Sequence, residues 1–433
     1  MNENLIEAQK LIDFIYESPT VFHAVENIKE ILIENSFLEL KEEDRWKIDK
    51  GGRYFVIRNQ SALVAFIAGS GKLEDDGFKI IGAHTDSPGF RIKPIPEIET
   101  EGSYIKLNTE VYGGPIINTW LDRPLSVAGR VVLKTNDFMN PETRLINIKR
   151  PLLVIPNLAI HMNRNVNSGI ELNKQKDILP ILALVNKEME SKNCLIKAIA
   201  EEINVEVNDI ADFDLFLYEF QKGCITGLNN EFISSGRLDD LSMVYAGISA
   251  LASSSESKST KVMVCFDNEE VGNTTKQGAN SDMLGSLLER ISICLGLNKE
   301  DYFRAQAKSF IISCDLGHAL HPNYPEKSDP VNRPVINKGP VIKISASQSY
   351  TSDGISSAVY EGVCRKVGIP VQRFVNRSDE RGGSTIGPTA SSKLNMRSVD
   401  IGIAVLAMHS IREFGGTLDY IYSLDSFVEY YNS

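Results

Sequence analysis

Two adjacent glutamates, Glu269 and Glu270, follow an apolar run in the segment VMVCFDNEEVG. Neighbouring carboxylates at the end of a strand repel each other unless a cation or a shared proton compensates their charge. Because side chains alternate along a strand, the pair can divide two tasks: one carboxylate takes a proton from water while the other binds a metal ion. The segment therefore indicates metal-assisted acid–base chemistry.

Two other apolar runs also end in polar side chains, His84 in IIGAHTDSPG and Asp315 in FIISCDLGHALHPNY. A residue at the carboxyl end of a strand projects into the crevice where open α/β sheets place their ligands. Asp86 is placed to accept the second imidazole N–H of His84 and so to orient the ring, although this short motif alone favours an ordinary polar pair. His318 and His321 follow Asp315, and the residues leave open whether they bind a metal or line a substrate pocket.

Asp239 and Asp240 open a predicted helix in SGRLDDLSM. One aspartate suffices to cap a helix, so the other is free to bridge two metal ions. We place His409 in an apolar C-terminal helix containing AVLAMHSIREF, where a lone histidine is usually a core residue. The candidate metal ligands are His84, Asp239, Glu270, Asp315 and His409. Such oxygen and imidazole donors suit zinc, manganese or cobalt, and two ions roughly 3.5–4 Å apart would hold a shared water and polarise a carbonyl.

The order of the strands and helices expected around these residues predicts an α/β fold with a mixed central β-sheet flanked by helices. Strands at 53–58, 62–68 and 78–84 follow two amphipathic helices, and from about residue 236 strands and helices alternate. Residues 92–235 have short alternating segments with many turn residues. We therefore predict a discontinuous catalytic domain, 1–91 with 236–433, interrupted by a mostly β module at 92–235.

Composition excludes several classes of function. The chain has 433 residues and a formal net charge of −11, which argues against nucleic-acid binding because that binding depends on Lys and Arg. The acidic N-terminus does not resemble a secretory signal, and no run reaches the 18 apolar residues of a membrane span. The six cysteines form no CxxC motif. We expect a cytoplasmic protein with reduced thiols and no membrane partner.

The motifs together resemble the aspartyl aminopeptidase family of dinuclear metallopeptidases over nearly the whole chain. The strings that carry the resemblance, in chain order, are HTDSPGFRIKP, PNLAIHMNR, SGRLDDL, DNEEVG, DLGHALHPNY, NKGPVIKIS, GGSTIGP and AMHSIRE. The resemblance implies the co-catalytic metallopeptidase fold and two divalent ions per subunit, zinc first, with cobalt or manganese as options.

The resemblance also implies a role for each residue of the site. Asp239 bridges both ions, His84 and Asp315 complete one site, and Glu270 and His409 complete the other. Glu269 is the general base that takes a proton from the bridging water and passes it to the leaving amine, and Asp86 orients His84. Residues implied to line the substrate pocket are His318, Lys343, Tyr350 and the loop Gly382–Gly387, including Gly383.

The implied substrates are peptides that lose their N-terminal residue. The family name implies Asp or Glu at that position, for which Lys343, with Arg381 behind it, would supply a cation; members that prefer neutral or basic residues leave this preference open. The resemblance further implies that residues 92–235 mediate dimerisation within a tetrahedral homo-oligomer of twelve subunits. His161 would then reach into the active site of a neighbouring subunit.

Two alternative functions are consistent with similar residues. A related co-catalytic hydrolase, such as a carboxypeptidase or deacylase, would use similar ligands but would accept N-acetylated substrates. A non-catalytic assembly protein would have lost a ligand or the base, whereas this chain retains all five ligand positions and Glu269.

Overall fold

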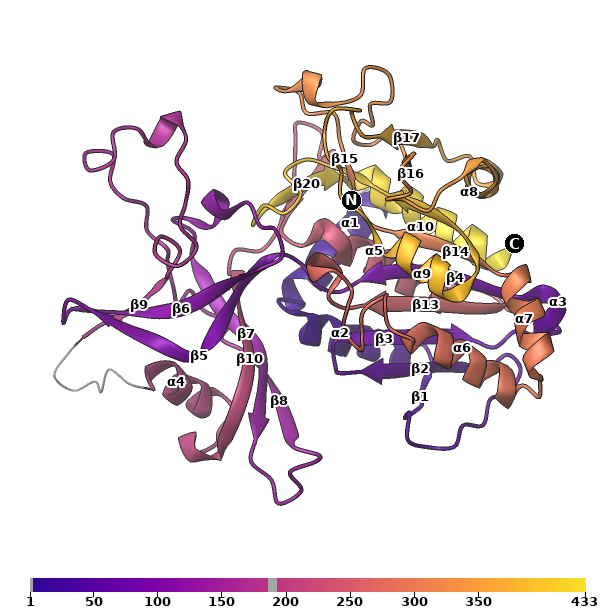
Figure 1. Ribbon diagram of the computed structural model, residues 1–433, viewed down its shortest axis with the longest axis horizontal. Helices are drawn as coiled ribbons and strands as arrows, with labels where there is room; N and C mark the ends of the chain where they lie inside the picture. Colours follow the sequence, from indigo (N-terminus) through magenta and orange to yellow (C-terminus); the bar gives the residue numbers. More distant parts are fainter. Residues whose placement is uncertain (1–2, 186–192) are drawn as a thin grey trace.

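A nine-stranded mixed sheet forms the centre of the larger part of the protein in the computed structural model, which describes residues 3–185 and 193–433 (Figure 1). Its strand order is β1-β2-β3-β13-β4-β14-β18-β16-β17. The strands are β1 (Leu38–Glu39), β2 (Arg53–Arg58), β3 (Ala62–Ile67), β4 (Phe78–His84), β13 (Thr260–Phe266), β14 (Phe310–Cys314), β16 (Val341–Ile344), β17 (Gln372–Val375) and β18 (Arg397–Gly402). Those predicted at 53–58, 62–68 and 78–84 are therefore β2, β3 and β4.

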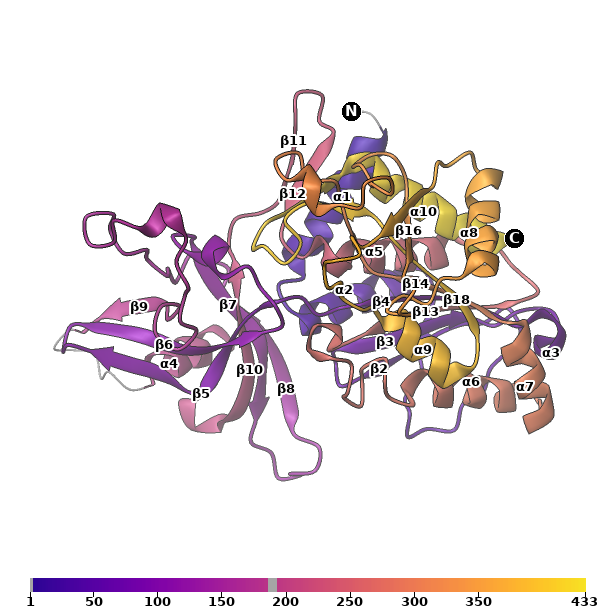
Figure 2. The ribbon, with the colours of Figure 1, turned by 45° about the horizontal axis from the view of Figure 1, so that its top comes forward.

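Helices cover both faces of this sheet, as Figures 1 and 2 show from two directions. One hydrophobic core lies between the sheet and α1, α2, α5, α8 and α10; a second lies between the opposite face and α6, α7 and α9. The helices are α1 (Glu3–Glu17), α2 (Val21–Glu34), α3 (Leu73–Asp76), α4 (Cys194–Glu202), α5 (Leu238–Ser253), α6 (Met283–Cys294), α7 (Lys299–Lys308), α8 (Gly354–Lys366), α9 (Ile386–Leu394) and α10 (Thr417–Asn432). The predicted α/β class, with a mixed sheet flanked by helices, is confirmed.

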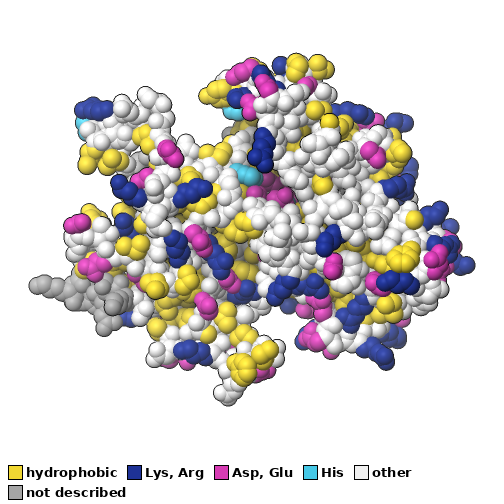
Figure 3. Space-filling view, in the orientation of Figure 1, with side chains coloured by type: hydrophobic (Ala, Val, Ile, Leu, Met, Phe, Trp, Pro, Cys, Tyr) yellow, Lys and Arg dark blue, Asp and Glu magenta, His cyan; other side chains and the backbone are white. Residues whose placement is uncertain are grey.

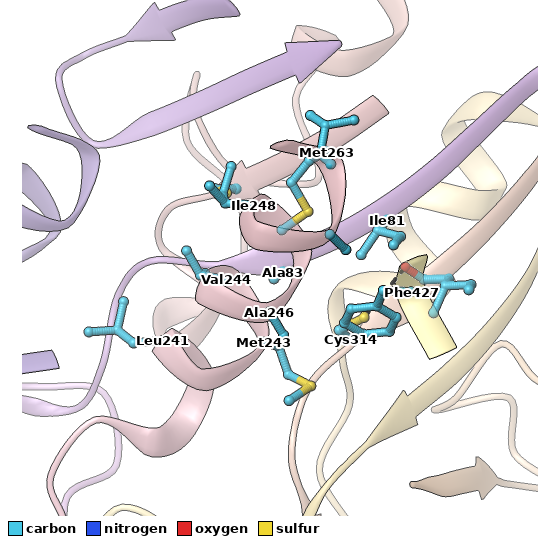
Figure 4. Close-up of a cluster of buried hydrophobic side chains, with 14 of the residues drawn as sticks. Ile81, Ala83, Leu241, Met243, Val244, Ala246, Ile248, Met263, Cys314 and Phe427 are labelled. Atoms are coloured by element: carbon cyan, nitrogen blue, oxygen red, sulfur yellow. Dashed lines mark hydrogen bonds between the residues drawn. The ribbon is translucent and has the colours of Figure 1, made fainter. Parts of the chain in front are cut away.

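Helix α5 packs closely on the centre of the sheet because it is apolar on most of its circumference (Figure 4). Its buried side chains meet Ile81 of β4 and Met263 of β13. A Cβ atom at Gly247 would lie 2.4 Å from the sulfur of Met263, so glycine permits this close approach. The packing fixes the start of α5, with Asp239, beside the ends of the central strands.

A second, six-stranded sheet is built from residues 89–219 and is antiparallel throughout, in the order β8-β7-β10-β5-β6-β9. It has its own hydrophobic core and projects from the larger part of the protein (Figures 1 and 2). Its strands are β5 (Gly89–Thr100), β6 (Tyr104–Tyr112), β7 (Leu125–Leu133), β8 (Glu142–Asn147), β9 (Ile181–Leu184) and β10 (Ile210–Glu219).

The segment AVLAMHSIREF is not the apolar helix that its periodicity predicts. Two small sheets contain it: β19 (Ala404–Val405) pairs with β15 (Gly317–His318), and β20 (Glu413–Gly416) pairs with β12 (Phe232–Ser235), which also pairs with β11 (Cys224–Thr226). His409 lies in the connection between β19 and β20, and its φ of 67° is incompatible with a helix. Pairing with strands distant in sequence has overridden the local helical pattern.

Among the described residues, no helix has the length and hydrophobicity needed to cross a membrane. No disulfide joins any two of the six cysteines in the described part of the chain.

Candidate metal centre

Three adjacent, mutually parallel strands, β13, β4 and β14, bring their carboxyl ends to one edge of the large sheet. His84 is the last residue of β4, Asp315 follows β14, and Glu269 and Glu270 follow β13 after a short connection. Figure 3 shows acidic and histidine side chains gathered in a hollow between the two parts of the molecule. The sheet therefore brings together residues that the sequence separates by more than two hundred positions.

Asp239 lies between two histidines and directs one carboxylate oxygen towards each. Its Oδ1 is 3.5 Å from Nε2 of His84, and its Oδ2 is 3.4 Å from Nε2 of His409. Donor atoms of His84, Asp239 and Asp315 lie within 4.8 Å of one another, and so do those of Asp239, Glu270 and His409. The two groups thus share Asp239.

The spacing of these atoms fits metal ligands better than it fits hydrogen bonds. Nε2 of His409 is also 3.3 Å from Oε1 of Glu270, and an N–H···O bond is usually about 2.7–3.2 Å long. A tetrahedral zinc ion with bonds of about 2.0–2.2 Å holds adjacent donors about 3.3–3.6 Å apart. In addition, Oδ1 of Asp239 is buried and accepts no hydrogen bond from a described residue. The centre is therefore suited to bind divalent cations.

Backbone carbonyls fix the tautomer of both histidines. Nδ1 of His84 lies 3.0 Å from the carbonyl oxygen of Asp86, and Nδ1 of His409 lies 3.1 Å from the carbonyl oxygen of Gly114. A carbonyl only accepts hydrogen bonds, so Nδ1 carries the proton of each neutral ring and Nε2 is the nitrogen that can bind a metal. The carboxylate of Asp86, which we expected to accept from His84, is 3.4 Å away, and the carbonyl of the same residue takes that part.

The carboxylate of Asp86 instead holds the turn that carries the two glutamates. It accepts the backbone N–H groups of Glu269 and Glu270, both at 3.1 Å, and the hydroxyl of Tyr112 at 2.8 Å. The glutamates lie on the 3-10 turn η4 (Glu269–Val271) and not on a strand end. The turn, and not strand alternation as expected, therefore sets the directions of the two side chains. No pattern in the sequence indicated Tyr112.

The surplus of buried carboxylates shifts the pKa values of the centre. Burial, reinforced by Asp315, raises the pKa of Glu269 to about 8, and burial raises that of Glu270 to about 7. Although burial opposes it, the carboxylates of Asp239 and Glu270 raise the pKa of His409 to about 11. Without a cation, such a centre retains protons that a bound metal ion would displace.

The residues predicted to line a substrate pocket lie in different surroundings. The Lys343 ammonium is 3.4 Å from Oδ2 of Asp315, donates to the Leu316 carbonyl at 3.0 Å and lies 5.2 Å from the ring centre of Tyr350. His318 is exposed beside Phe374, with ring centres 5.8 Å apart. The predicted pocket residues outside this cluster are Gly383, exposed in the loop before α9, and His161, exposed in the loop between β8 and β9.

The chain is similar to known proteins over nearly its whole length. The model of a family described as aminopeptidase I zinc metalloprotease (M18) matches residues 14–431. A probable M18 family aminopeptidase 2 of Clostridium novyi is 61% identical over 432 residues, covering 100% of both chains. One of Pseudomonas savastanoi pv. phaseolicola is 43% identical and covers 94% of each chain.

Solved structures show the same likeness. A chain in the cryo-EM structure of the Ape4 and Nbr1 complex superposes with a TM-score of 0.94 at 37% identity, covering 98% of this chain and 85% of that one. The S. cerevisiae mApe1 dodecamer superposes with a TM-score of 0.84 at 30% identity, covering 99% and 97%. Because the family model matches nearly the whole chain and relatives match it from end to end, the chain belongs to the M18 family of aminopeptidases, a family of zinc metalloproteases.

Proposed function

We propose that this aminopeptidase binds two divalent cations, one between His84, Asp239 and Asp315 and the other between Asp239, Glu270 and His409. The observation that carries the proposal is the pair of donor groups that share the Asp239 carboxylate, one oxygen towards each group. Two cations in such a centre would polarise the scissile carbonyl and lower the pKa of water towards neutrality.

In this proposal Glu269 is the general base. One of its carboxylate oxygens lies within 4.8 Å of donor atoms of His84 and Glu270, one from each proposed ion position, and this proximity supports a base placed between them. Glu269 would take a proton from water there and deliver it to the leaving amine, while Asp86 holds its backbone in place. Its raised pKa suits this exchange, because a base with a pKa near the working pH transfers protons best in both directions.

A substrate panel tests the proposed reaction. Aminoacyl 4-nitroanilides with Asp, Glu, Ala, Leu and Lys should be hydrolysed by zinc-, cobalt- or manganese-reconstituted protein, whereas their N-acetylated forms should react at least about 100-fold more slowly. The reason is that an aminopeptidase binds the free α-amine. Comparable hydrolysis of the acetylated series would contradict the proposal and favour the deacylase or carboxypeptidase alternative.

We further propose that the same site prefers substrates with an acidic N-terminal residue and that the Lys343 ammonium binds the acidic side chain. The Lys343 ammonium already faces Asp315, so much of its charge is balanced within the protein. We therefore expect Asp and Glu substrates to exceed Leu and Ala by a modest factor, about 10-fold, and Lys343→Met to remove that margin. Equal kcat/KM for the acidic and apolar substrates would end this part of the proposal.

We also propose that residues 92–235 assemble the chain into a homo-oligomer, as a tetrahedral dodecamer, in which His161 reaches a neighbouring active site. In support, the loop bearing His161 exposes apolar side chains close to that histidine, Leu158, Ile160 and Met162, and projects from the smaller part of the protein (Figure 1). The S. cerevisiae relative is itself described as a dodecamer. Light scattering should give twelve times the chain mass, and a monomer that is fully active would contradict the proposal.

A further inference from the structure

Glu413 is a buried carboxylate beside the metal centre, and none of the sequence motifs indicated a role for it. Its side chain, at the start of β20, is 2% exposed. Oε2 accepts the backbone N–H of Asp239 at 3.0 Å, and Oε1 accepts the backbone N–H of His409 at 2.7 Å. One side chain therefore holds the backbones of two proposed metal ligands that lie far apart in sequence.

Both of these N–H groups belong to irregular backbone. Asp239, near the start of α5, has non-helical dihedral angles, φ −82° and ψ 104°. His409 has a φ of 67°, a left-handed conformation that is unfavourable for a residue other than glycine. The Glu413 carboxylate supplies an acceptor to each N–H and so helps to retain both conformations.

The arrangement parallels the role of Asp86 on the other side of the centre. Asp86 accepts the N–H groups of Glu269 and Glu270, as Glu413 accepts those of Asp239 and His409. The segment that follows β6 contributes a further restraint on His409, because the His409 ring donates to the Gly114 carbonyl and the His409 carbonyl accepts the N–H of Ile116. The position of His409 thus depends on contacts made on two sides of its loop.

We infer that Glu413 is a positioning residue that sets the separation of Asp239 and His409 and thereby the affinity of the ion position they share with Glu270. The inference rests on the proposed two-cation function. The position formed by His84 and Asp315 depends on Glu413 only through Asp239 and is therefore affected less.

Glu413→Gln tests the inference with little change in side-chain volume. The amide keeps one acceptor oxygen, but its NH₂ group faces an N–H donor in place of the second acceptor. The ion held by Asp239, Glu270 and His409 should bind about 10- to 100-fold more weakly, which is the usual loss when a residue that hydrogen-bonds a metal ligand is replaced. The affinity of the other ion should change less. Competition with a chromophoric chelator measures both affinities, and the visible absorption of the cobalt-loaded protein reports ligand geometry independently of activity.

Asp419→Asn is the matched control. Asp419 is likewise buried and accepts two backbone N–H groups, those of Asn337 at 2.5 Å and Gly339 at 2.8 Å, but it belongs to neither donor group. Both variants should lower the melting temperature of the metal-free protein. Only Glu413→Gln should weaken ion binding and alter the cobalt spectrum.

The possible results separate the role of Glu413 from the two-cation proposal. Unchanged affinities and spectrum in Glu413→Gln, or equal losses in both variants, would overturn the role of Glu413 while leaving the two-cation proposal intact. A wild-type protein that binds fewer than two ions would overturn the proposed function and this inference with it. If Glu413→Gln proves insoluble, Glu413→Asp is read by the same criteria, since it keeps two acceptors but shortens their reach.

Discussion

Replacing Glu269 with glutamine should lower kcat by about two to four orders of magnitude while both of the proposed metal ions stay bound. The amide preserves the shape of the side chain but cannot take a proton from water. Glu269 belongs to neither of the donor groups that share Asp239, so ion content should be unaffected. Metal analysis and steady-state kinetics on the same preparation measure the two properties together.

The neighbouring substitution, Glu270→Gln, provides the comparison. Glu270 lies 3.3 Å from His409 in one proposed ion position, so its loss should remove an ion as well as activity. A Glu269→Gln variant that keeps full turnover would show that another group is the base. If that variant instead lost an ion, Glu269 would have to be reassigned as a ligand.

The pH dependence of the wild type provides a second check on Glu269. Burial raises its pKa to about 8, and adjacent cations would favour the ionised form and bring the value down. Because the base acts when deprotonated, kcat should rise with pH along a limb centred below about 8 and level off above it. Glu269→Gln should abolish that limb, and a limb that persists unchanged in this variant would belong to a different group.

Asp239→Asn should have the other large effect, the loss of both proposed ions at stoichiometric metal and of essentially all activity. Asp239 is the residue common to both donor groups, with one oxygen towards His84 and the other towards His409. An amide offers one oxygen ligand and one NH₂ group, which cannot bind a cation. We expect each affinity to fall by at least about 100-fold, more than the loss of a partner behind a ligand would cause.

The adjacent Asp240→Asn is the control for this prediction. Asp240 is equally buried and accepts the backbone N–H of His84 at 3.1 Å, but it belongs to neither donor group that shares Asp239. Burial raises the pKa of Asp240 well above its ordinary value, which favours the protonated acid, and asparagine keeps the size of the side chain. The control should keep both ions. Similar losses in the two variants would mean that Asp239 does not act as a bridge.

Sequence patterns predicted the part of the site that depends on strands. His84 and Asp315 each end or follow an apolar run, and such runs in a parallel sheet direct their carboxyl ends to one edge. Helix α5, with Asp239 near its start, was also predictable from the sequence because its apolar residues have helical spacing. These features are local, since periodicity within a few residues determines which element forms and where it ends.

His409 and its surroundings depended on the tertiary structure. The apolar spacing of AVLAMHSIREF favours a helix, but β19 and β20 pair with strands built from residues near 317 and 232, and the turn between them carries His409. The acceptor role of Glu413 and the contact of Tyr112 with Asp86 likewise arise only when distant segments meet. By itself the sequence determined the donor types, the class of fold and the family motifs. Which atoms face one another was decided by strand pairing and packing between segments far apart in the chain, which no local pattern records.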